Sequence, residues 1–217
     1  MSSEQPESIN CKVVLLGETG VGKTCLIERY TKSEFHDNFA PTLGGTFIEK
    51  EVGYKTYNKT IKFQIWDTAG QEKYRSINKL FYSDANIAIL VYDITRKETF
   101  DEIKNYWYEQ VKENAPKNIQ MVIVGNKSDL YEFQEVPTED VKQYAEEFGA
   151  SAYECSAKTS VGVEEVFKKS GLRLINPNAG EVSFSELKQK EDLKKSVFIS
   201  KPQSQTEEKK KRKAGCC

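Results

Sequence analysis

The chain has 217 residues, and 38% of them are hydrophobic, which is enough to bury one core and leave residues for a tail. Residues 1–176 hold 22 basic and 27 acidic side chains, whereas residues 177–217 hold 10 basic and 6 acidic ones. The mildly acidic body argues against nucleic acid as a partner, because binding its phosphates needs a basic face. The basic tail instead favours an anionic surface.

Cysteine and histidine usage excludes two further classes. The five cysteines show no C-x-x-C spacing, and His36 is the single histidine, so a zinc site or a Ser/His/Asp triad is not expected. We interpret His36 as an exposed loop residue. No secretory signal opens the chain and no apolar run approaches 18 residues, so we expect the protein on the cytosolic side of membranes.

Short apolar runs alternate with longer amphipathic ones, which predicts an α/β fold with a mostly parallel sheet. The expected strands are 9–16, 45–54, 60–66, 86–92, 119–125 and 151–155. The expected helices are 22–32, 72–82, 96–114, 138–148 and 161–175. Polar residues in the second strand suit an edge strand, paired antiparallel with the third. We therefore expect a disordered segment at 1–8, one domain at 9–176 and a flexible tail at 177–217.

A glycine-rich loop directly follows the first expected strand. Its spacing is G-x-x-x-x-G-K-[ST], formed by Gly17, Glu18, Thr19, Gly20, Val21, Gly22, Lys23 and Thr24. Such glycines let several backbone N–H groups converge on one anion, beside the positive end of the next helix. The loop predicts a nucleotide, with Lys23 on the outer phosphates and Thr24 on Mg²⁺. A turn without a ligand is the bland alternative. Cys25, the next residue, is included in the expected site.

A second motif follows the strand 119–125 and predicts which base is bound. Asp129 can accept hydrogen bonds from N1–H and the 2-amino group of guanine, whereas adenine offers neither donor. The Lys127 stem can cover one face of the ring. Asn126 is counted in the same site. Taken alone, these residues fit a solvated turn after a strand as well as they fit a base-binding motif. Only their combination with the glycine-rich loop predicts a guanine nucleotide.

Two weaker signals belong to the same base. The loop of Ser156, Ala157 and Lys158 follows the last expected strand and can offer a backbone N–H to guanine O6. Phe35 is compatible with an edge-on contact to the base and equally with a place in the core. Neither feature predicts binding by itself.

Two segments are placed to respond to the terminal phosphate. Asp67 is expected to hold Mg²⁺ through water, Gly70 to donate its N–H to the γ-phosphate, and Gln71 to orient the attacking water. Thr42 is positioned to close over Mg²⁺ and the γ-phosphate. The expected catalytic residues are therefore Lys23, Thr42 and Gln71. Since hydrolysis removes the group that holds both segments, a two-state switch is predicted.

These motifs resemble those of Ras-like small GTPases over about residues 9–175. Segments 62–66, 73–77 and 90–95 are similar to Rab proteins in particular. Two segments depart from the Rab pattern: Leu43-Gly44-Gly45-Thr46-Phe47 replaces Ile-Gly-Val-Asp-Phe, and Phe81-Tyr82-Ser83-Asp84-Ala85 replaces Tyr-Tyr-Arg-Gly-Ala. The glycines are expected to loosen the first segment and remove an apolar contact.

The resemblance implies the P-loop NTPase fold of small G-proteins, GTP/GDP and Mg²⁺ as ligands, and slow GTP hydrolysis. It also implies an exchange factor, a GTPase-activating protein, a GDP-dissociation inhibitor or escort protein, and effectors. We expect a monomer. Sequence reasoning places no arginine to act in cis, so a partner's arginine is expected to accelerate hydrolysis.

The chain ends in a basic run, Lys209–Lys213, followed by Cys216 and Cys217. This ending resembles the Cys-Cys tails of Rab proteins, which carry two geranylgeranyl groups. Two lipid chains give stable anchoring where one does not, and the basic run adds attraction to an anionic leaflet. The expected location is the cytoplasmic face of an endomembrane, with cycling through the cytosol.

The sequence thus predicts a Rab-like GTP/GDP switch in vesicle trafficking. The main alternative is a GTP-bound docking module with negligible hydrolysis, which Gln71 and Thr42 disfavour. A P-loop kinase of small metabolites would need a second substrate pocket and a lid, and the sequence offers no candidate for either.

Overall fold

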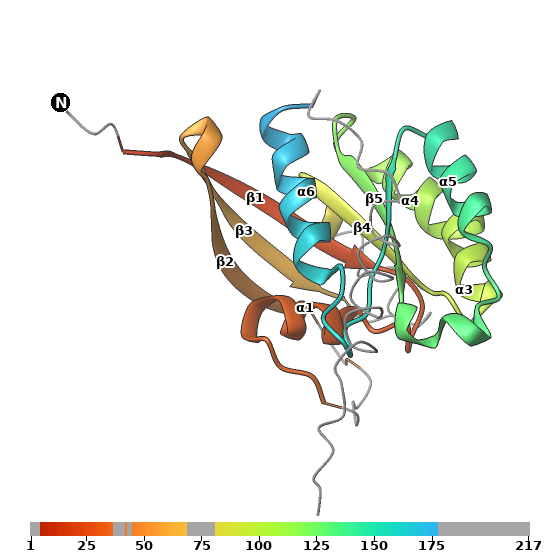
Figure 1. The fold of residues 1–217 in the computed structure, drawn as a ribbon. Helices are drawn as coiled ribbons and strands as arrows, with labels where there is room; N and C mark the ends of the chain where they lie inside the picture. Colours follow the sequence, from red (N-terminus) through yellow and green to blue (C-terminus); the bar gives the residue numbers. More distant parts are fainter. Residues whose placement is uncertain (1–4, 37–41, 43–44, 69–80, 178–217) are drawn as a thin grey trace, which may run out of the picture. The chain divides into compact units, whose positions relative to one another are not determined.

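A computed structural model describes residues 5–36, 42, 45–68 and 81–177, and the structural statements below concern these residues. They form a sheet of six strands in the order β2-β3-β1-β4-β5-β6 (Figure 1). The strands are β1 (Glu7–Leu16), β2 (Thr46–Tyr54), β3 (Lys59–Asp67), β4 (Ile87–Asp93), β5 (Gln120–Asn126) and β6 (Ser151–Glu154). Only the β2–β3 pair is antiparallel, which confirms the predicted edge hairpin and α/β fold.

One boundary of the sheet differs from the prediction. β1 begins at Glu7, whose N–H donates to the Asn58 carbonyl at 3.1 Å. Glu7 and Ser8 also pair with β3. They therefore belong to the sheet rather than to a disordered N-terminal segment, because the neighbouring strand offers partners for their backbone groups.

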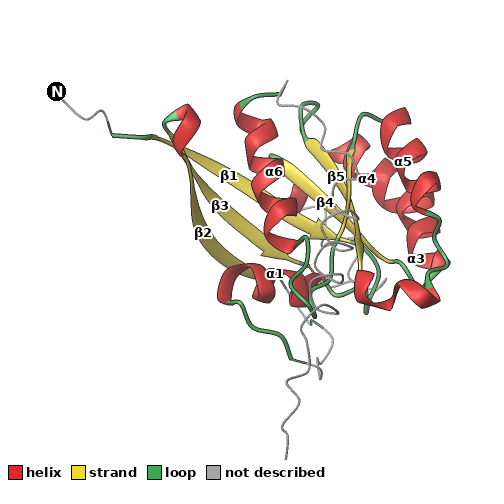
Figure 2. Cartoon of the chain, viewed as in Figure 1, coloured by secondary structure: helices red, strands yellow, loops and turns green. Residues whose placement is uncertain are grey.

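The described α-helices are α1 (Lys23–Lys32), α3 (Lys97–Glu102), α4 (Tyr108–Asn114), α5 (Thr138–Glu147) and α6 (Val163–Ile175). Two 3₁₀ turns, η1 (Lys55–Tyr57) and η4 (Ser128–Phe133), follow β2 and β5. Figure 2 shows α6 crossing in front of the strands while α3, α4 and α5 gather to the right. None of the helices in these residues is long and apolar enough to cross a membrane.

The two faces of the sheet are covered by different helices. On one face Leu90 of β4 belongs to a buried cluster with Phe100 of α3, Trp107 of the turn η3 (Ile103–Trp107) and Val141 of α5. On the other face, Leu15, Ile89 and Val124 surround one small void with side chains of α1 and α6. All seven residues of β4 are buried, as its apolar sequence predicted for a central strand.

The predicted helix 96–114 is present with an interruption. Between α3 and α4 the helix widens into a π turn, η3 (Ile103–Trp107), while the residues on both sides keep right-handed helical angles. The turn carries Ile103 and Trp107, both buried against the sheet. Most of the predicted helix 72–82 lies outside the described residues. Its last two residues, 81 and 82, are described and are helical.

Gly171, in the middle of α6, has a packing reason that its sequence position did not reveal. A Cβ at this residue would lie 2.1 Å from Tyr54 Oη and 2.7 Å from Phe63 Cζ. Tyr54 Oη also donates to the Lys168 carbonyl of α6 at 2.9 Å. The absence of a side chain therefore lets α6 approach β2 and β3 closely enough for this hydrogen bond.

Candidate functional site

The described residues enclose a cavity of about 380 Å³ where the loops after β1, β5 and β6 meet. This is the carboxyl edge of the parallel strands, where α/β folds bind ligands. Its predicted lining residues are Thr19, Gly20, Gly22, Lys23, Thr24, Cys25, Phe35, Thr42, Asn126, Lys127, Asp129, Ala157 and Lys158. Thr68, Leu130 and His36 also line it. These three carry no motif, although their neighbours Asp67, Asp129 and Phe35 do.

The glycine-rich loop has the backbone that its sequence predicts. Gly17, Gly20 and Gly22 have φ angles of 139°, 76° and 93°, which favour glycine. A Cβ on Gly17 would lie 2.2 Å from the Val91 carbonyl oxygen, and one on Gly22 would lie 2.4 Å from Asn126 Nδ2. Backbone angle and close packing thus both require glycine, and the loop ends at the N-terminus of α1.

Lys23 lies under this loop with its ammonium group inside the protein. Its Nζ donates to the Gly17 carbonyl at 2.7 Å and to the Glu18 carbonyl at 3.0 Å. Burial lowers the pKa of Lys23 to about 8, although the charges of Asp67 and Glu18 act to raise it. A cation held in this way, with a ring of backbone groups around it, suits an anion above the loop.

Thr24, Thr42 and Asp67 meet at one end of the cavity. Thr24 Oγ1 donates to Asp67 Oδ2 at 2.7 Å and lies 2.9 Å from Thr42 Oγ1. Asp67 Oδ1 is buried and has no hydrogen-bond partner among the described residues. Burial raises the pKa of Asp67, against the hydrogen bond from Thr24 and the charge of Lys23. A buried carboxylate with a free oxygen beside two hydroxyls fits Mg²⁺, which prefers oxygen ligands.

Asn126 joins the phosphate loop to the base loop. Its Nδ2 donates to the Val21 carbonyl at 2.8 Å, and its Oδ1 accepts the Ala157 N–H at 3.1 Å. The residue is 2% exposed, and each of its two polar side-chain atoms has a hydrogen-bond partner. Asn126 therefore positions both loops, a role that its place in a binding motif did not indicate.

Asp129 is oriented by a neighbour from the third predicted segment. Ser156 Oγ donates to Asp129 Oδ1 at 2.5 Å and accepts the Thr159 N–H at 3.0 Å. Ser156 is fully buried and does not line the cavity. Ser156 therefore lies behind the residues that line the cavity, where its hydroxyl holds the Asp129 carboxylate in place.

Asp93 and Arg96 contact residues of the cavity, although the sequence motifs did not indicate either of them. The Lys127 ammonium lies 2.6 Å from Asp93 Oδ2, and Arg96 Nε donates to the same oxygen at 3.3 Å. Arg96 Nη2 also donates to the Thr19 carbonyl at 3.2 Å, which places a positive charge beside the phosphate loop in cis. Burial raises the pKa of Asp93, but hydrogen bonds from Lys127 and Thr95 outweigh it and hold that pKa below its usual range.

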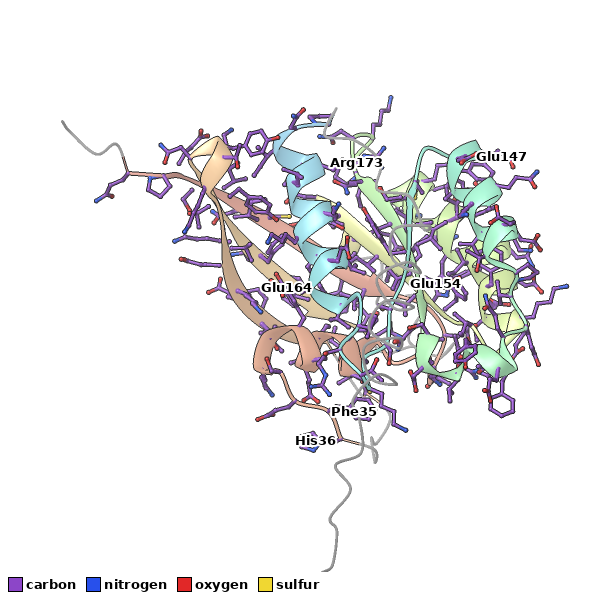
Figure 3. The ribbon with its side chains drawn as sticks, viewed as in Figure 1. Phe35, His36, Glu147, Glu154, Glu164 and Arg173 are labelled. Carbon is purple, nitrogen blue, oxygen red and sulfur yellow. The ribbon has the colours of Figure 1, made fainter. Side chains whose placement is uncertain are left out.

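Phe35 follows α1 and forms part of the cavity wall. Its ring lies 5.8 Å from the Arg29 guanidinium carbon, so the structure favours the wall over the core for this side chain. Figure 3 shows Phe35 and His36 together beyond the end of α1. His36 is exposed, as expected. Gly70, Gln71, Cys216 and Cys217 lie outside the described residues.

The comparisons with known proteins agree with this geometry. The Ras family profile matches residues 12–176. Human Ras-related protein Rab-31 is 45% identical over 157 residues, which cover 72% of this chain and 79% of the relative. Mouse Rab-22A is 40% identical over 189 residues, covering 85% and 96%. RABA4a of Arabidopsis thaliana is 44% identical over 165 residues, covering 76% and 72%.

The matched region begins in β1 and ends after α6, so it includes the whole cavity. All three relatives are Rab proteins by name, in agreement with the Rab-like segments noted in the sequence. The family assignment also favours a hydrolysing enzyme over a docking module without hydrolysis. The chain belongs to the Ras family as a Rab-type small GTPase, an enzyme that binds GTP and GDP with Mg²⁺, hydrolyses GTP and regulates vesicle trafficking.

Proposed function

We propose that the 380 Å³ cavity is the guanine nucleotide site, with the phosphates and Mg²⁺ at one end and the base at the other. The main support for this proposal is that a single cavity extends from the cluster of Thr24, Thr42 and Asp67 to Asp129. The Asp129 carboxylate is in turn held by Ser156. Lys23 and the glycine-rich loop bind the phosphates. Lys127 and Asp129 bind the base, with a backbone N–H of the Ser156–Lys158 loop for O6.

At the phosphate end, Thr24, Thr42 and Asp67 hold Mg²⁺. When bound, the ion neutralises charge that develops on the phosphates during transfer. The Thr42 hydroxyl is proposed to bind beside that of Thr24, and its distance of 2.9 Å from Thr24 Oγ1 supports that role. Lys23 supplies a positive charge at the outer phosphates, and its buried position keeps that charge from being screened by water.

The hydrolytic step is proposed to depend on Gln71, with Gly70 donating to the γ-phosphate. An amide side chain is too weak a base to remove a proton, so Gln71 orients the attacking water and the rest is charge stabilisation. Changing Gln71→Leu is expected to slow hydrolysis and leave GTP binding intact. Single-turnover assays with radiolabelled GTP measure the rate, and an unchanged rate would contradict the water-positioning role.

Base recognition is tested by changing Asp129→Asn. The amide offers a donor where the carboxylate accepts, so preference should move from guanine toward xanthine nucleotides, which carry an oxygen in place of the 2-amino group. Competition of GDP and XDP for the purified protein measures the preference. Asp140→Asn, at an exposed position of α5, is the matched control and keeps guanine preference. If Asp129→Asn keeps it as well, Asp129 does not recognise the base.

The regulators of a Rab-type GTPase include exchange factors, activating proteins and effectors in general. We propose further that the protein is a monomer and that an escort protein or GDP-dissociation inhibitor carries it. Cys216 and Cys217 are proposed to receive two geranylgeranyl groups and, with the basic run, to hold the protein on the cytoplasmic face of an endomembrane between periods in the cytosol.

A further inference from the structure

Arg29 lies in the last turn of α1, the helix that begins with Lys23 and Thr24. Its guanidinium group donates three hydrogen bonds to carbonyl oxygens. Nε reaches Ala157 at 2.8 Å, Nη2 reaches Lys158 at 3.0 Å and Nη1 reaches Ser33 at 2.8 Å. One planar group therefore ties the end of α1 to a loop 128 residues further along the chain.

Two of the three carbonyl groups that Arg29 holds belong to residues of the cavity wall at the base end. Ala157 and Lys158 both line the nucleotide cavity. Ser33 ends α1 with a φ of 62°, and the chain then runs directly into Phe35, whose ring lies beside the guanidinium. Arg29 thus contacts two segments that contribute to the wall, the loop after β6 and the segment after α1.

Arg29 itself does not line the nucleotide cavity. It borders a second, separate cavity of about 260 Å³ together with Ser33 and Ser160. A direct contact with nucleotide is therefore not its role. The adjoining space also means that water can reach the freed carbonyls if the side chain is shortened, so the loss of Arg29 does not leave buried groups without partners.

We propose that Arg29 is a positioning residue for the guanine base: it holds the Ser156–Lys158 loop and Phe35 in the places that bind the base, without touching the nucleotide. The inference rests on the proposed assignment of this cavity to a guanine nucleotide. Arg29 bonds the carbonyls of Ala157 and Lys158, so its loss weakens the contact of this part of the loop to guanine O6. The contact of Asp129 to the 2-amino group persists, because Ser156 holds that carboxylate and is itself held by a hydrogen bond from its N–H to the Val161 carbonyl at 2.9 Å.

The test compares Arg29→Ala, Arg29→Lys and Lys32→Ala in the full chain. Lys32 is the matched control, since it lies on the same turn of α1, is exposed and pairs only with Glu28 at 3.5 Å among the described residues. Release of fluorescent GDP should be about tenfold faster for Arg29→Ala, the effect of about one lost hydrogen bond, and unchanged for Lys32→Ala. Arg29→Lys keeps the charge but loses the planar fork, so it should release GDP at an intermediate rate.

A base-specific readout separates positioning from a general loss of stability. Each protein is also titrated with 6-thio-GDP, whose sulfur is a weaker acceptor than O6, and with IDP, which lacks the 2-amino group. In Arg29→Ala the preference for GDP over 6-thio-GDP should fall about fivefold or more, while the preference over IDP stays.

An Arg29→Ala variant that releases GDP within twofold of the wild type, or that keeps the full preference over 6-thio-GDP, overturns the inference. If Arg29→Ala does not fold, the same two readouts on Arg29→Lys decide it. Should the wild type show no preference for GDP over IDP, the fault lies in the proposed base site rather than in Arg29.

Discussion

Two charged side chains beside the cavity, Lys23 and Asp93, are nearly inaccessible to solvent, at 5% and 1% exposure. Their surroundings move their pKa values for different reasons. Burial dominates at Lys23 and lowers its pKa to about 8, whereas at Asp93 the hydrogen bonds from Lys127 and Thr95 outweigh burial and lower the pKa. Lys23 lines the cavity, whereas Asp93 faces the cations of Lys127 and Arg96.

For Lys23 we expect nucleotide affinity to fall as the pH rises above about 8. The unliganded protein then loses the ammonium proton, and binding must restore it, which costs up to about tenfold in affinity per pH unit. Titrations with fluorescent GDP between pH 7 and pH 9 measure the slope. The Lys23→Met variant should bind more weakly and should lack the part of the pH dependence that comes from Lys23. Any pH dependence that remains in this variant comes from other groups, such as the nucleotide itself. Equal slopes for the two proteins would contradict the assignment.

For Asp93 we expect Asp93→Asn to lower the free energy of unfolding by about 2 kcal/mol, since charged hydrogen bonds to Lys127 and Thr95 are lost. Because the folded pKa is lowered, the stabilisation is present above the unfolded value of about 3.9 and is lost as the pH falls through the folded value. Urea unfolding at pH 7 and pH 3.5 should therefore show a smaller difference at pH 3.5.

The control for this prediction is Asp101→Asn, which breaks an ion pair with Lys104 at 2.7 Å on a more exposed surface. We expect a cost below about 1 kcal/mol there. A loss at Asp93 no larger than at Asp101 would show that the buried ion pairs contribute little.

Sequence motifs predicted most of the residues that line the cavity, Asn126 included, together with Ser156 behind them, and missed the supporting residues Asp93, Arg96 and Arg29. Thr24, Asp67 and Asp129 were recognisable because their spacing from a strand end is local. Asp93 lies opposite Asn126 only through the register of β4 and β5, and Arg29 reaches the base loop across the fold. Contacts between distant segments leave no local pattern, so sequence reasoning had no signal for them.

At the scale of elements, α6 depends on the missing side chain of Gly171. We expect Gly171→Ala to destabilise the protein by about 1–3 kcal/mol through overpacking against Tyr54 and Phe63, although alanine favours a helix by up to about 1 kcal/mol. Thermal and urea unfolding measure the loss. Gly53→Ala in β2, where a Cβ meets nothing within 4 Å, is the control and should be nearly neutral.

The two departures from the Rab pattern are connected in the structure. A Cβ on Gly45 would lie 2.7 Å from Phe81 Cζ, so the Phe81 ring lies where a side chain at residue 45 would be. Phe81 also packs on Trp66 with ring centroids 5.4 Å apart, and Trp66 packs on Phe47 at 5.1 Å. An aromatic ring therefore fills the space that a side chain at Gly45 would take, while the expected loosening of the segment stays a prediction.

Elements were predicted better than their irregularities. Every described strand was expected within a few residues, because apolar runs and turn residues mark strands along the chain. The π turn at Ile103–Trp107 lies inside a predicted helix whose sequence pattern did not indicate it, and both end residues of the turn belong to the buried cluster. Tertiary packing decides such features after the local pattern has set the helix.

At the scale of the whole molecule, the tail is predicted to act independently of the nucleotide domain. Replacing both Cys216→Ser and Cys217→Ser should move the protein from the membrane pellet to the supernatant of fractionated cells, while either single change leaves a weakly bound fraction. GDP binding by the double variant should equal that of the wild type, which serves as the control. Continued pelleting of the double variant would count against lipid anchoring.

The loops after β1, β5 and β6 leave the sheet at the edge where the cavity lies, so a reporter can be attached at the opposite edge. Lys117 lies there, exposed, in the connection from α4 to β5. A dye or short epitope attached at Lys117 would stand a full strand length from the nucleotide. Single-molecule imaging of this protein on vesicles could then follow its arrival and departure without altering the chemistry that times them.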